Sequence, residues 1–449
     1  MAKVHPASAD CVNTSVEYWN SVPPTQSYMD TGKWYYVNPV GNSLNMESIS
    51  FEVAGSPDEF VDLHNSYLLW DFKVRKADGT TAVADTVTCG PINMIGTTMW
   101  QTEEFYLNGE RVTGVSQLAN FANYAEALLG YGPSSKEQLE LQGFHIDTAG
   151  CHDSTSSATT SSATTKDASP NSGLLVRKQR FKGDATWKLC SRFPSELAKQ
   201  PLLIPNRMDM KLILHRAKAA AYMMSEDEAL GAKLVITSAQ LKIRKIKMDP
   251  EFLLAHELLL AKRNALIFFE EKNILELTIN AGVMSFARDD LFRGVIPKKA
   301  ILALVDSAAV AGNYKKNPLK IDSANLNQVG FIVNGENLPS RPLQFSPGDG
   351  FERDGYLSLL ETTGLMFQNT SLMFDPDHWA KGFALMAFSF EPDLGHSSCL
   401  SRRRTGVVGL DMRFHAALPS TMTLICIYYR DSILEIDSRR NPFLPYKRV

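Results

Sequence analysis

The sequence predicts an all-β protein that consists of two similar β-sandwiches in tandem. The hexapeptide FYLNGE at residues 105–110 recurs as FIVNGE at residues 331–336, and a Tyr, two Leu and a Gly follow each copy at roughly helical spacing. An internal repeat of this kind indicates two copies of one structural unit. Short strand patterns separated by turn signals occur in both halves, and 449 residues exceed what a single core usually serves.

The composition is that of a globular protein without an evident targeting segment. Hydrophobic residues make up 44% and charged residues 21%, and the formal net charge is -3. This charge argues against a coat that binds nucleic acid mainly by counterion release. Six cysteines without a CxxC pair are typical of a reducing compartment. The N-terminus, MAKVHPASAD, lacks an apolar h-region, and no apolar run approaches 18 residues, so we expect neither a secretion signal nor a membrane span.

Residues 1–40 are expected to form an N-terminal arm. Residues 18–40 are rich in aromatic side chains, and Pro23-Pro24 prevents a helix there. Two interpretations stay open for this segment. It either packs Trp19, Tyr28, Trp34 and Tyr35 on a neighbouring surface or forms a strand at a sheet edge of the same chain.

The first sandwich is expected over residues 41–248. Strands are predicted at residues 49–53, 67–75 and 104–107, and the last of these ends at the hairpin signal Asn108-Gly109. A helical period then places Phe121, Tyr124 and Leu128 on one face, and Gly130 ends the helix. Residues 153–172 are low-complexity Ser, Thr and Ala, which predicts a flexible surface loop; a linker between domains is the alternative.

Residues 249–264 are expected to form a helix that joins the two sandwiches. Asp249 suits the N-cap, Pro250 the first helical position, and Glu251 the positive end of the helix dipole. The apolar residues of this helix form a broad face: Phe252, Leu254, Ala255, Leu258 and Leu259.

The second sandwich is expected over residues 265–437, followed by a C-terminal tail at residues 438–449. Strands are predicted at residues 275–279, 301–305, 329–333, 410–414, 423–428 and 433–436. The strand at residues 329–333 ends at the second hairpin signal, Asn334-Gly335.

No pattern in the sequence points to catalysis, to a cofactor or to a metal ion. The phosphate-binding glycine motifs are absent, and Gly348-Asp349-Gly350 is interpreted as a turn. The segment Asp375-Pro376-Asp377 lacks the later ligands of a calcium loop and is interpreted as a turn or helix start. Adjacent residues such as Cys151-His152-Asp153 cannot reach the geometry of a catalytic triad. We therefore expect no enzyme activity, with no catalytic, cofactor-binding or metal-binding residues.

Two groups of basic residues remain. The first lies on a predicted strand, where outward charges are usually solvated or protect a sheet edge: Lys242, Arg244, Lys245 and Lys247. Two interpretations stay open for the second group. Its side chains contact nucleic acid or an acidic neighbour, or they are solvated or form salt bridges between subunits. Its members are Arg402, Arg403, Arg404, Arg439, Arg440, Lys447 and Arg448. Neither group is a strong nucleic-acid signal.

Three blocks of the second half, in the same order, resemble the double jelly-roll major capsid proteins of Polinton/Maverick elements and adintoviruses. The first block comprises Asp290-Leu291-Phe292, Pro297-Lys298-Lys299, YKKNP at residues 314–318 and NGENLPSRP at residues 334–342. The others are residues 381–394 (KGFALMAFSFEPDL) and 433–441 (ILEIDSRRN). The first-half matches are residues 51–55, 105–109, 124–132 and 253–257. The chain departs from the family at residues 153–172 and 399–404.

The resemblance implies that each sandwich is a jelly roll and that the chain is a major capsid protein. Three chains would form a homotrimeric capsomer with a pseudo-hexagonal outline, which tiles an icosahedral shell with penton or minor capsid proteins. The expected location is the virion, assembled inside the host cell in the cytoplasm or nucleus. The alternative is a double jelly-roll carbohydrate-binding or cupin-like protein.

Overall fold

The computed structural model of the chain describes residues 23–41, 44–115, 117–156, 170–346, 352–394 and 400–444, besides Ala7, Ser15 and Tyr18. Several sequence predictions lie outside these residues. They are the contact of Trp19, the greater part of the loop at residues 153–172, the turn at Gly348-Asp349-Gly350, and the tail residues Lys447 and Arg448.

Residues 29–248 contain two four-stranded antiparallel sheets that face each other. One sheet has the order β1 (Met29–Val37), β10 (Lys233–Met248), β3 (Glu59–Arg75), β7 (Trp187–Arg192). The other has the order β2 (Ser48–Val53), β8 (Met210–Arg216), β5 (Trp100–Leu107), β6 (Glu110–Val115). A small sheet pairs β4 (Cys89–Pro91) with β9 (Met223–Ser225).

Residues 265–443 repeat this arrangement. One sheet has the order β11 (Ala265–Ile279), β18 (Met422–Ile436), β13 (Lys299–Asp306), β16 (Met386–Ser389), and β19 (Pro442–Phe443) pairs with β18. The other has the order β12 (Ser285–Val295), β17 (Thr405–Phe414), β14 (Leu326–Val333), β15 (Glu336–Gln344).

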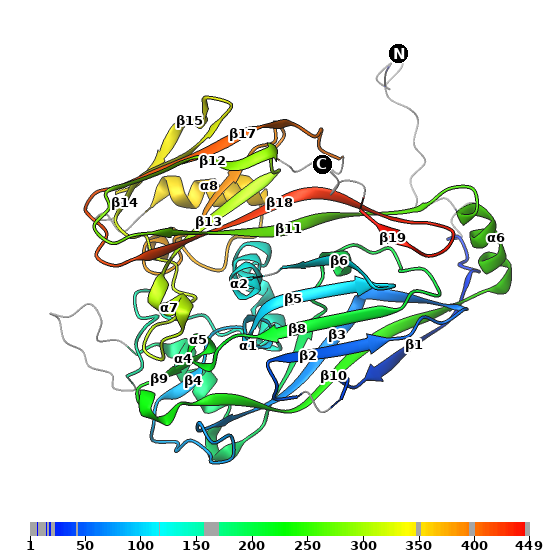
Figure 1. Cartoon of the computed structure of the whole chain (residues 1–449), viewed down its shortest axis with the longest axis horizontal. Coiled ribbons are helices and arrows are strands. Elements are labelled where there is room, and N and C mark those ends of the chain that lie inside the picture. Colours follow the sequence, from blue (N-terminus) through cyan, green and yellow to red (C-terminus); the bar gives the residue numbers. More distant parts are fainter. Residues whose placement is uncertain are drawn as a thin grey trace.

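The two halves share one topology, strand for strand. In chain order, β1, β2, β3, β5, β6, β7, β8 and β10 correspond to β11 through β18, and both sheets keep the same strand order. Eight strands in two packed sheets with these long connections form a jelly roll. The predicted all-β fold of two tandem jelly rolls, with short helices in the loops and one joining helix, is therefore confirmed. Figure 1 shows the first jelly roll below the second.

Helices fill the connections between strands. In the first jelly roll they are α1 (Ile95–Thr98), α2 (Ala119–Gly130), α3 (Lys136–Glu140), α4 (Ser172–Gln179) and α5 (Ala219–Tyr222), with 3-10 turns at Pro133–Ser135, Lys182–Asp184, Glu196–Lys199 and Glu228–Leu230. The joining helix is α6 (Pro250–Leu260), and the second jelly roll contains α7 (Ser307–Ala311), α8 (Arg353–Thr363) and α9 (Pro376–Trp379).

The repeated hexapeptides end in matching hairpins. Asn108 and Gly109 join β5 to β6 with φ angles of 44° and 84°, and Asn334 and Gly335 join β14 to β15 with φ angles of 51° and 92°. Two consecutive residues with positive φ form the turn that suits the right-handed twist of a hairpin, and Asn-Gly tolerates this conformation best. Both hairpin predictions are confirmed.

Aromatic side chains dominate the core of both jelly rolls. Phe51, Trp70 and Phe105 are fully buried in the first, and Trp70 donates its indole N–H to Ser191 Oγ at 2.7 Å. Phe331 packs edge-on against Phe388 in the second, with ring centroids 4.9 Å apart. Most buried apolar side chains of both jelly rolls form one continuous cluster, and Phe60, Ile246 and Met248 form a second, small one.

The segment expected as an arm contributes a strand. Met29–Val37 forms β1, which pairs antiparallel with β10 at the edge of the first sheet. Of the two interpretations left open, the sheet-edge strand describes these residues. Its side chains remain largely exposed, so its sequence carries no buried alternation that would have revealed the strand.

The joining helix begins as expected, but its apolar face is only partly covered. Asp249 accepts a hydrogen bond from Glu251 N at 2.8 Å, as an N-cap should. Phe252 stacks on Tyr28 with ring centroids 5.4 Å apart, whereas Leu254 and Leu258 are 65% and 58% exposed. Figure 1 shows α6 at one end of the molecule.

The two strands predicted at residues 423–428 and 433–436 are a single strand, so the prediction of a break was wrong. Strand β18 runs from Met422 to Ile436. The polar residues at its centre have partners that allow the strand to continue: Arg430 donates to Val295 O at 2.9 Å, and Asp431 accepts from Ser401 N at 2.9 Å.

Candidate functional site

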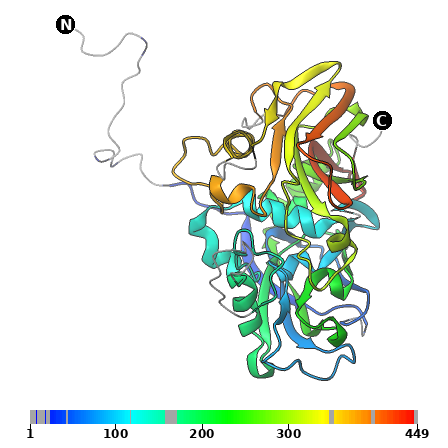
Figure 2. The same ribbon diagram turned by 90° about the vertical axis from the view of Figure 1, so that its left-hand side faces the viewer.

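The junction between the two jelly rolls contains several buried charged contacts that link distant parts of the chain. Strand β11 of the second jelly roll lies against β6 and the Glu196–Lys199 turn of the first, and α2 contacts α8. Figure 2 shows α2 lying across the boundary between the two units. Three separate polar clusters hold this boundary.

The first cluster surrounds Lys272, which β11 places on the outer face of its sheet. Its ammonium group lies 3.2 Å from Glu196 Oε1 and 3.4 Å from Glu126 Oε1, and it donates to Asn123 Oδ1 at 3.1 Å. Only 3% of the Lys272 side chain is exposed. The hydroxyl of Tyr429, on the neighbouring strand β18, donates to Glu126 Oε1 at 3.2 Å.

The surroundings of the cluster shift the pKa values of its members. Burial alone would lower the pKa of Lys272, but the carboxylates of Glu126, Glu196 and Glu103 raise it above its ordinary value. Burial would raise the pKa of Glu126, and the ammonium groups of Lys199 and Lys272 lower it instead. Glu103 is different, because burial outweighs the attraction of Lys272 and raises its pKa to about 7. The cluster therefore holds Lys272 charged and carries one carboxyl group that binds a proton easily.

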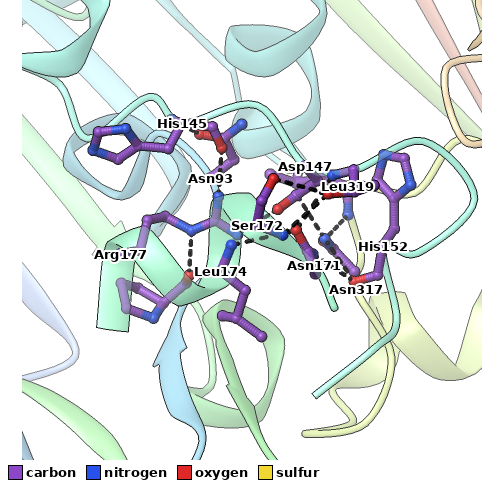
Figure 3. A network of polar contacts seen from close by, with 12 residues as sticks. Asn93, His145, Asp147, His152, Asn171, Ser172, Leu174, Arg177, Asn317 and Leu319 are labelled. Carbon is purple, nitrogen blue, oxygen red and sulfur yellow. Dashed lines mark hydrogen bonds and ion pairs between the residues drawn. The ribbon is translucent and has the colours of Figure 1, made fainter. Parts of the chain in front are cut away.

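The second cluster joins the YKKNP segment of the second jelly roll to the first (Figure 3). Asn317 is 2% exposed and donates from Nδ2 to Asp147 Oδ2 at 3.0 Å. The other carboxylate oxygen of Asp147 lies 2.7 Å from Arg177 Nη2, and both of these side chains are fully buried. Asp153 accepts from Asn317 N at 2.8 Å and from Lys320 Nζ at 2.7 Å.

Arg177 is held on every side by acceptors of the first jelly roll. Its Nε donates to Pro91 O at 2.8 Å and its Nη1 to His145 O at 2.6 Å, in addition to the Asp147 contact. A buried guanidinium with its donors paired fixes the loop that presents Asp147 to Asn317. The second jelly roll is thus attached to a rigid part of the first.

The third cluster lies near α6, where the C-terminal segment returns to the first jelly roll. Arg440 is 4% exposed; it donates to Asn206 Oδ1 and Glu257 Oε1, both at 2.6 Å, and its carbonyl accepts from Asn108 Nδ2 at 2.7 Å. None of the roles considered for Arg440 in the sequence, which were solvated surface, a contact between subunits or nucleic-acid binding, fits a buried side chain.

The three clusters connect distant segments of the chain. Each pairs buried charges or amides from segments more than 140 residues apart, as in Lys272 with Asn123 and Arg440 with Asn206. Buried ion pairs add little net stability over an apolar core, but removing one partner is costly. We infer that they hold the two jelly rolls in one relative orientation.

The residues that superficially suggested chemistry have other contacts in the structure. In the described residues, neither ring nitrogen of the buried His152 has a hydrogen-bond partner, and its ring packs edge-on against Phe383 instead. Asp153, its neighbour in the sequence, binds Lys320. Asp375 lies at the start of α9, as one of the two interpretations predicted.

In the described part of the chain, no group of three or more His, Cys, Asp and Glu side chains is placed to hold a metal ion. Within the same residues, no helix is both long enough and apolar enough to cross a membrane.

The basic residues of β10 cover aromatic side chains of β1. Lys242 Nζ lies 5.1 Å from the ring centroid of Trp34 and 5.9 Å from that of Tyr36, and Arg244 lies 5.2 Å from Trp34. Lys245 Nζ lies 5.6 Å from the ring centroid of Tyr35 and 3.6 Å from Glu59, whereas Lys247 pairs with Asp58 at 3.8 Å. In the other basic group, Arg404 lies 3.6 Å from Glu391 and also donates to Phe390 O, whereas Arg402 is exposed.

Sequence reasoning missed Lys272, Glu103, Glu126 and Arg177. A lone lysine among the charged residues of a strand gives no signal, because only the packing of another domain makes that position buried. Asn317 belongs to the YKKNP segment that carried the family resemblance, so that motif did point to a residue of the junction.

Comparison with solved structures identifies the fold. The chain aligns with a chain of the Sputnik virophage structure at a TM-score of 0.61 and 10% identity, over 97% of this chain and 92% of that one. The Faustovirus major capsid protein gives a TM-score of 0.53 at 9% identity, over 95% and 92%. The PBCV-1 virus capsid gives 0.51 at 10% identity, over 95% and 99%. The chain has the double jelly-roll fold of viral capsid proteins.

A protein of similar length occurs among curated sequences. An uncharacterized protein of Caenorhabditis elegans is 22% identical over 451 residues, which cover 94% of this chain and 99% of that protein. No family model matches the sequence.

Proposed function

We propose that the chain is a major capsid protein that forms homotrimeric capsomers with a pseudo-hexagonal outline, and that these tile an icosahedral shell. The fold supports this proposal, since the similar structures are those of the Sputnik virophage, the PBCV-1 virus capsid and the Faustovirus major capsid protein. The spaced sequence blocks favour a protein of the Polinton/Maverick and adintovirus type. Its place would be the virion, after assembly inside the host cell.

The observation that carries the proposal is the junction of two jelly rolls with one topology. Lys272, Asn317 and Arg440 each connect the two units through buried polar contacts. Three copies of such a fixed pair supply six similar units, which suit a ring with nearly sixfold packing while leaving two chemically different surfaces for neighbours.

The domain division follows from the same argument. We propose residues 265–437 as the second jelly roll, the helix within residues 249–264 as the join, and residues 438–449 as a tail. For the first jelly roll we propose a start at Met29 rather than at residue 41, because β1 pairs with β10. Residues 153–172 are proposed as a surface loop.

The proposed role is structural, without catalysis, and the proposed partners are other copies of the chain and penton or minor capsid proteins. Native mass spectrometry of the purified protein tests the oligomer directly. We expect a complex of three 49.9 kDa chains. A monomer across the micromolar range would contradict the proposal, and tight binding of a sugar or a metal ion by that monomer would favour a binding protein instead.

A further inference from the structure

A buried histidine of the first jelly roll packs into the second. His152 is fully buried, and its ring packs edge-on against Phe383 of the second jelly roll, with ring centroids 4.8 Å apart. The ring also lies directly against the backbone of Gly382, where a Cβ atom would overlap it and where φ is 111°. The imidazole therefore fills the junction at the place where residues 147–153 meet the second jelly roll.

The ring of His152 occupies this place as a neutral group. Among the described residues, neither ring nitrogen has a hydrogen-bond partner, and Figure 3 shows the ring beside the polar network without a contact to it. A neutral imidazole carries one N–H group, whereas an imidazolium carries two N–H donors and a positive charge. Because an unpaired buried charge is costly, burial lowers the pKa of His152 below its ordinary value.

The charged side chains that act on this ring do not offset its burial. They are two carboxylates and two cations: Asp147, Asp153, Arg177 and Lys320. The carboxylates would attract an imidazolium, but each already pairs with one of the cations at 2.7 Å. The cations repel a positive ring. From the side of the second jelly roll, Lys381 precedes Gly382 and is exposed. Burial therefore determines the state of the ring.

The cluster around Lys272 responds differently to acid. The ammonium groups of Lys199 and Lys272 hold the pKa of Glu126 below its ordinary value, so this carboxylate stays charged in mild acid. Burial raises the pKa of Glu103 to about 7, so mild acid neutralises this buried carboxyl group in place. Acid therefore opposes the packing of His152 and leaves the Lys272 cluster joined.

We propose that His152 is an acid-sensitive latch between the two jelly rolls. Protonation drives the ring from its place between Gly382 and Phe383 into water, which accepts hydrogen bonds from both of its N–H groups. Residues 147–153 then separate from the second jelly roll, while the Lys272 cluster keeps the two units together. The latch is a property of the single chain. Its consequence, a shell that loosens in an acidified compartment, rests on the proposed function.

The thiol of Cys151 gives a local readout of the latch, because it precedes His152 and is 6% exposed. The wild-type protein is treated with a neutral disulfide reagent, and mass spectrometry measures the modification of each cysteine relative to the same thiol in the denatured chain. An open state with the ordinary pKa of 6.5 and a closed state that stays neutral predict an open population that rises roughly 25-fold from about pH 7 to about pH 5. We expect the relative labelling rate of Cys151 to rise by up to this factor, and that of Cys426, in the core of the second jelly roll, to stay constant.

A substitution assigns the response to the imidazole. His152→Phe keeps an aromatic ring that cannot bind a proton, so it should remove the pH dependence of Cys151 labelling. The matched control His215→Phe replaces an exposed histidine of β8 and should keep the wild-type dependence. Circular dichroism checks that both variants keep the fold. The wild-type profile needs no substitution and decides the question even when His152→Phe fails to fold.

Hydroxyl-radical footprinting of the wild-type protein reports on the other part of the junction. Tyr429, which is 5% exposed beside Glu126, should stay protected at both pH values. A constant relative labelling rate of Cys151 in the wild type, or an equal rise in His152→Phe, would overturn the latch. Exposure of Tyr429 together with Cys151 would show that the whole junction opens, which also contradicts the proposal. Absence of trimers and particles would overturn the proposed function and leave the result for the latch unchanged.

Discussion

The ammonium nitrogen of Lys272 lies 3.2 Å from a carboxylate oxygen of Glu196, and the two residues belong to different jelly rolls. Lys272 and Glu196 are 3% and 8% exposed, so neither charge is compensated by water. The pair links the two units through a buried ionic contact, and a change that removes either partner inside the packed junction leaves the other charge buried without it.

Replacing Lys272 by Met should destabilise the protein strongly. The substitution keeps the length of the side chain but leaves Glu126 and Glu196 with only the partly exposed ammonium group of Lys199, at 2.8 and 3.5 Å. Removing one partner of a buried ion pair costs about 3–5 kcal/mol, and because Lys199 remains, we expect a loss of about 3 kcal/mol or less. Chemical denaturation measures this loss. The control Lys211→Met removes an exposed pair with Glu52 and should change the free energy of unfolding by about 0.5 kcal/mol or less.

Stability should depend on pH through Glu103. Its ordinary pKa of 4.5 is raised to about 7 by burial, so between these values the folded chain binds a proton that the unfolded chain has released. The stabilising contribution is complete below pH 4.5 and is lost as the pH rises through 7, with a slope of up to about 1.4 kcal/mol per pH unit. Denaturation curves between pH 5 and pH 8, in the window set by these pKa values, measure it.

The variant Glu103→Gln isolates this contribution. Gln cannot ionise and can still accept the hydrogen bond that Asn123 donates to Glu103. We expect it to reduce the slope and to be more stable than the wild type above pH 7. Glu104→Gln, whose side chain points to the opposite side of β5, should keep the wild-type slope. An unchanged slope in Glu103→Gln would show that another group titrates.

Replacing Asn317 by Ala should loosen the end of the junction near α7. The change removes the amide group that donates to Asp147 Oδ2, so this buried carboxylate oxygen loses that hydrogen bond. An unsatisfied buried polar group costs about 1–3 kcal/mol. Thermal unfolding of Asn317→Ala measures the loss. Lys315→Ala, which removes a pair at 4.0 Å between exposed side chains, is the matched control and should be nearly neutral.

Arg404 should contribute to stability, whereas Arg402 should be available for contact with a neighbouring capsomer. Arg404 contacts Glu391 and Phe390 within its own jelly roll, so Arg404→Ser should lower stability. Arg402 is exposed, so Arg402→Ser should leave the unfolding temperature and the trimer mass unchanged. If this loop touches a neighbouring capsomer, the same variant changes the yield of particles, which light scattering detects. A normal yield would remove Arg402 from the lattice contacts.

Local sequence signals predicted hairpins such as those at Asn108-Gly109 and Asn334-Gly335, whereas the pairing of β1 and the buried position of Arg440 depend on long-range packing. Asn108-Gly109 and Asn334-Gly335 located two hairpins, because left-handed turns restrict the residue types that fit them. Strand β1 remained ambiguous, since its aromatic residues stay exposed and only the pairing with β10 defines it. The buried position of Arg440 depends on Asn206 and Glu257, which are far away in the sequence, so no local pattern could reveal it.

Electron microscopy of the purified chain tests the central claim most directly. A capsid subunit makes numerous weak and partly ionic contacts with neighbouring capsomers, whereas the trimer rests on larger buried surfaces. Ionic strength should therefore affect the shell and the trimer differently. We predict closed shell-like particles at moderate salt that dissociate into intact trimers when the salt concentration or pH changes, with an unchanged β-sheet signal in circular dichroism. A protein that stays dispersed under every condition, without particles or trimers, would contradict a role in building a viral shell.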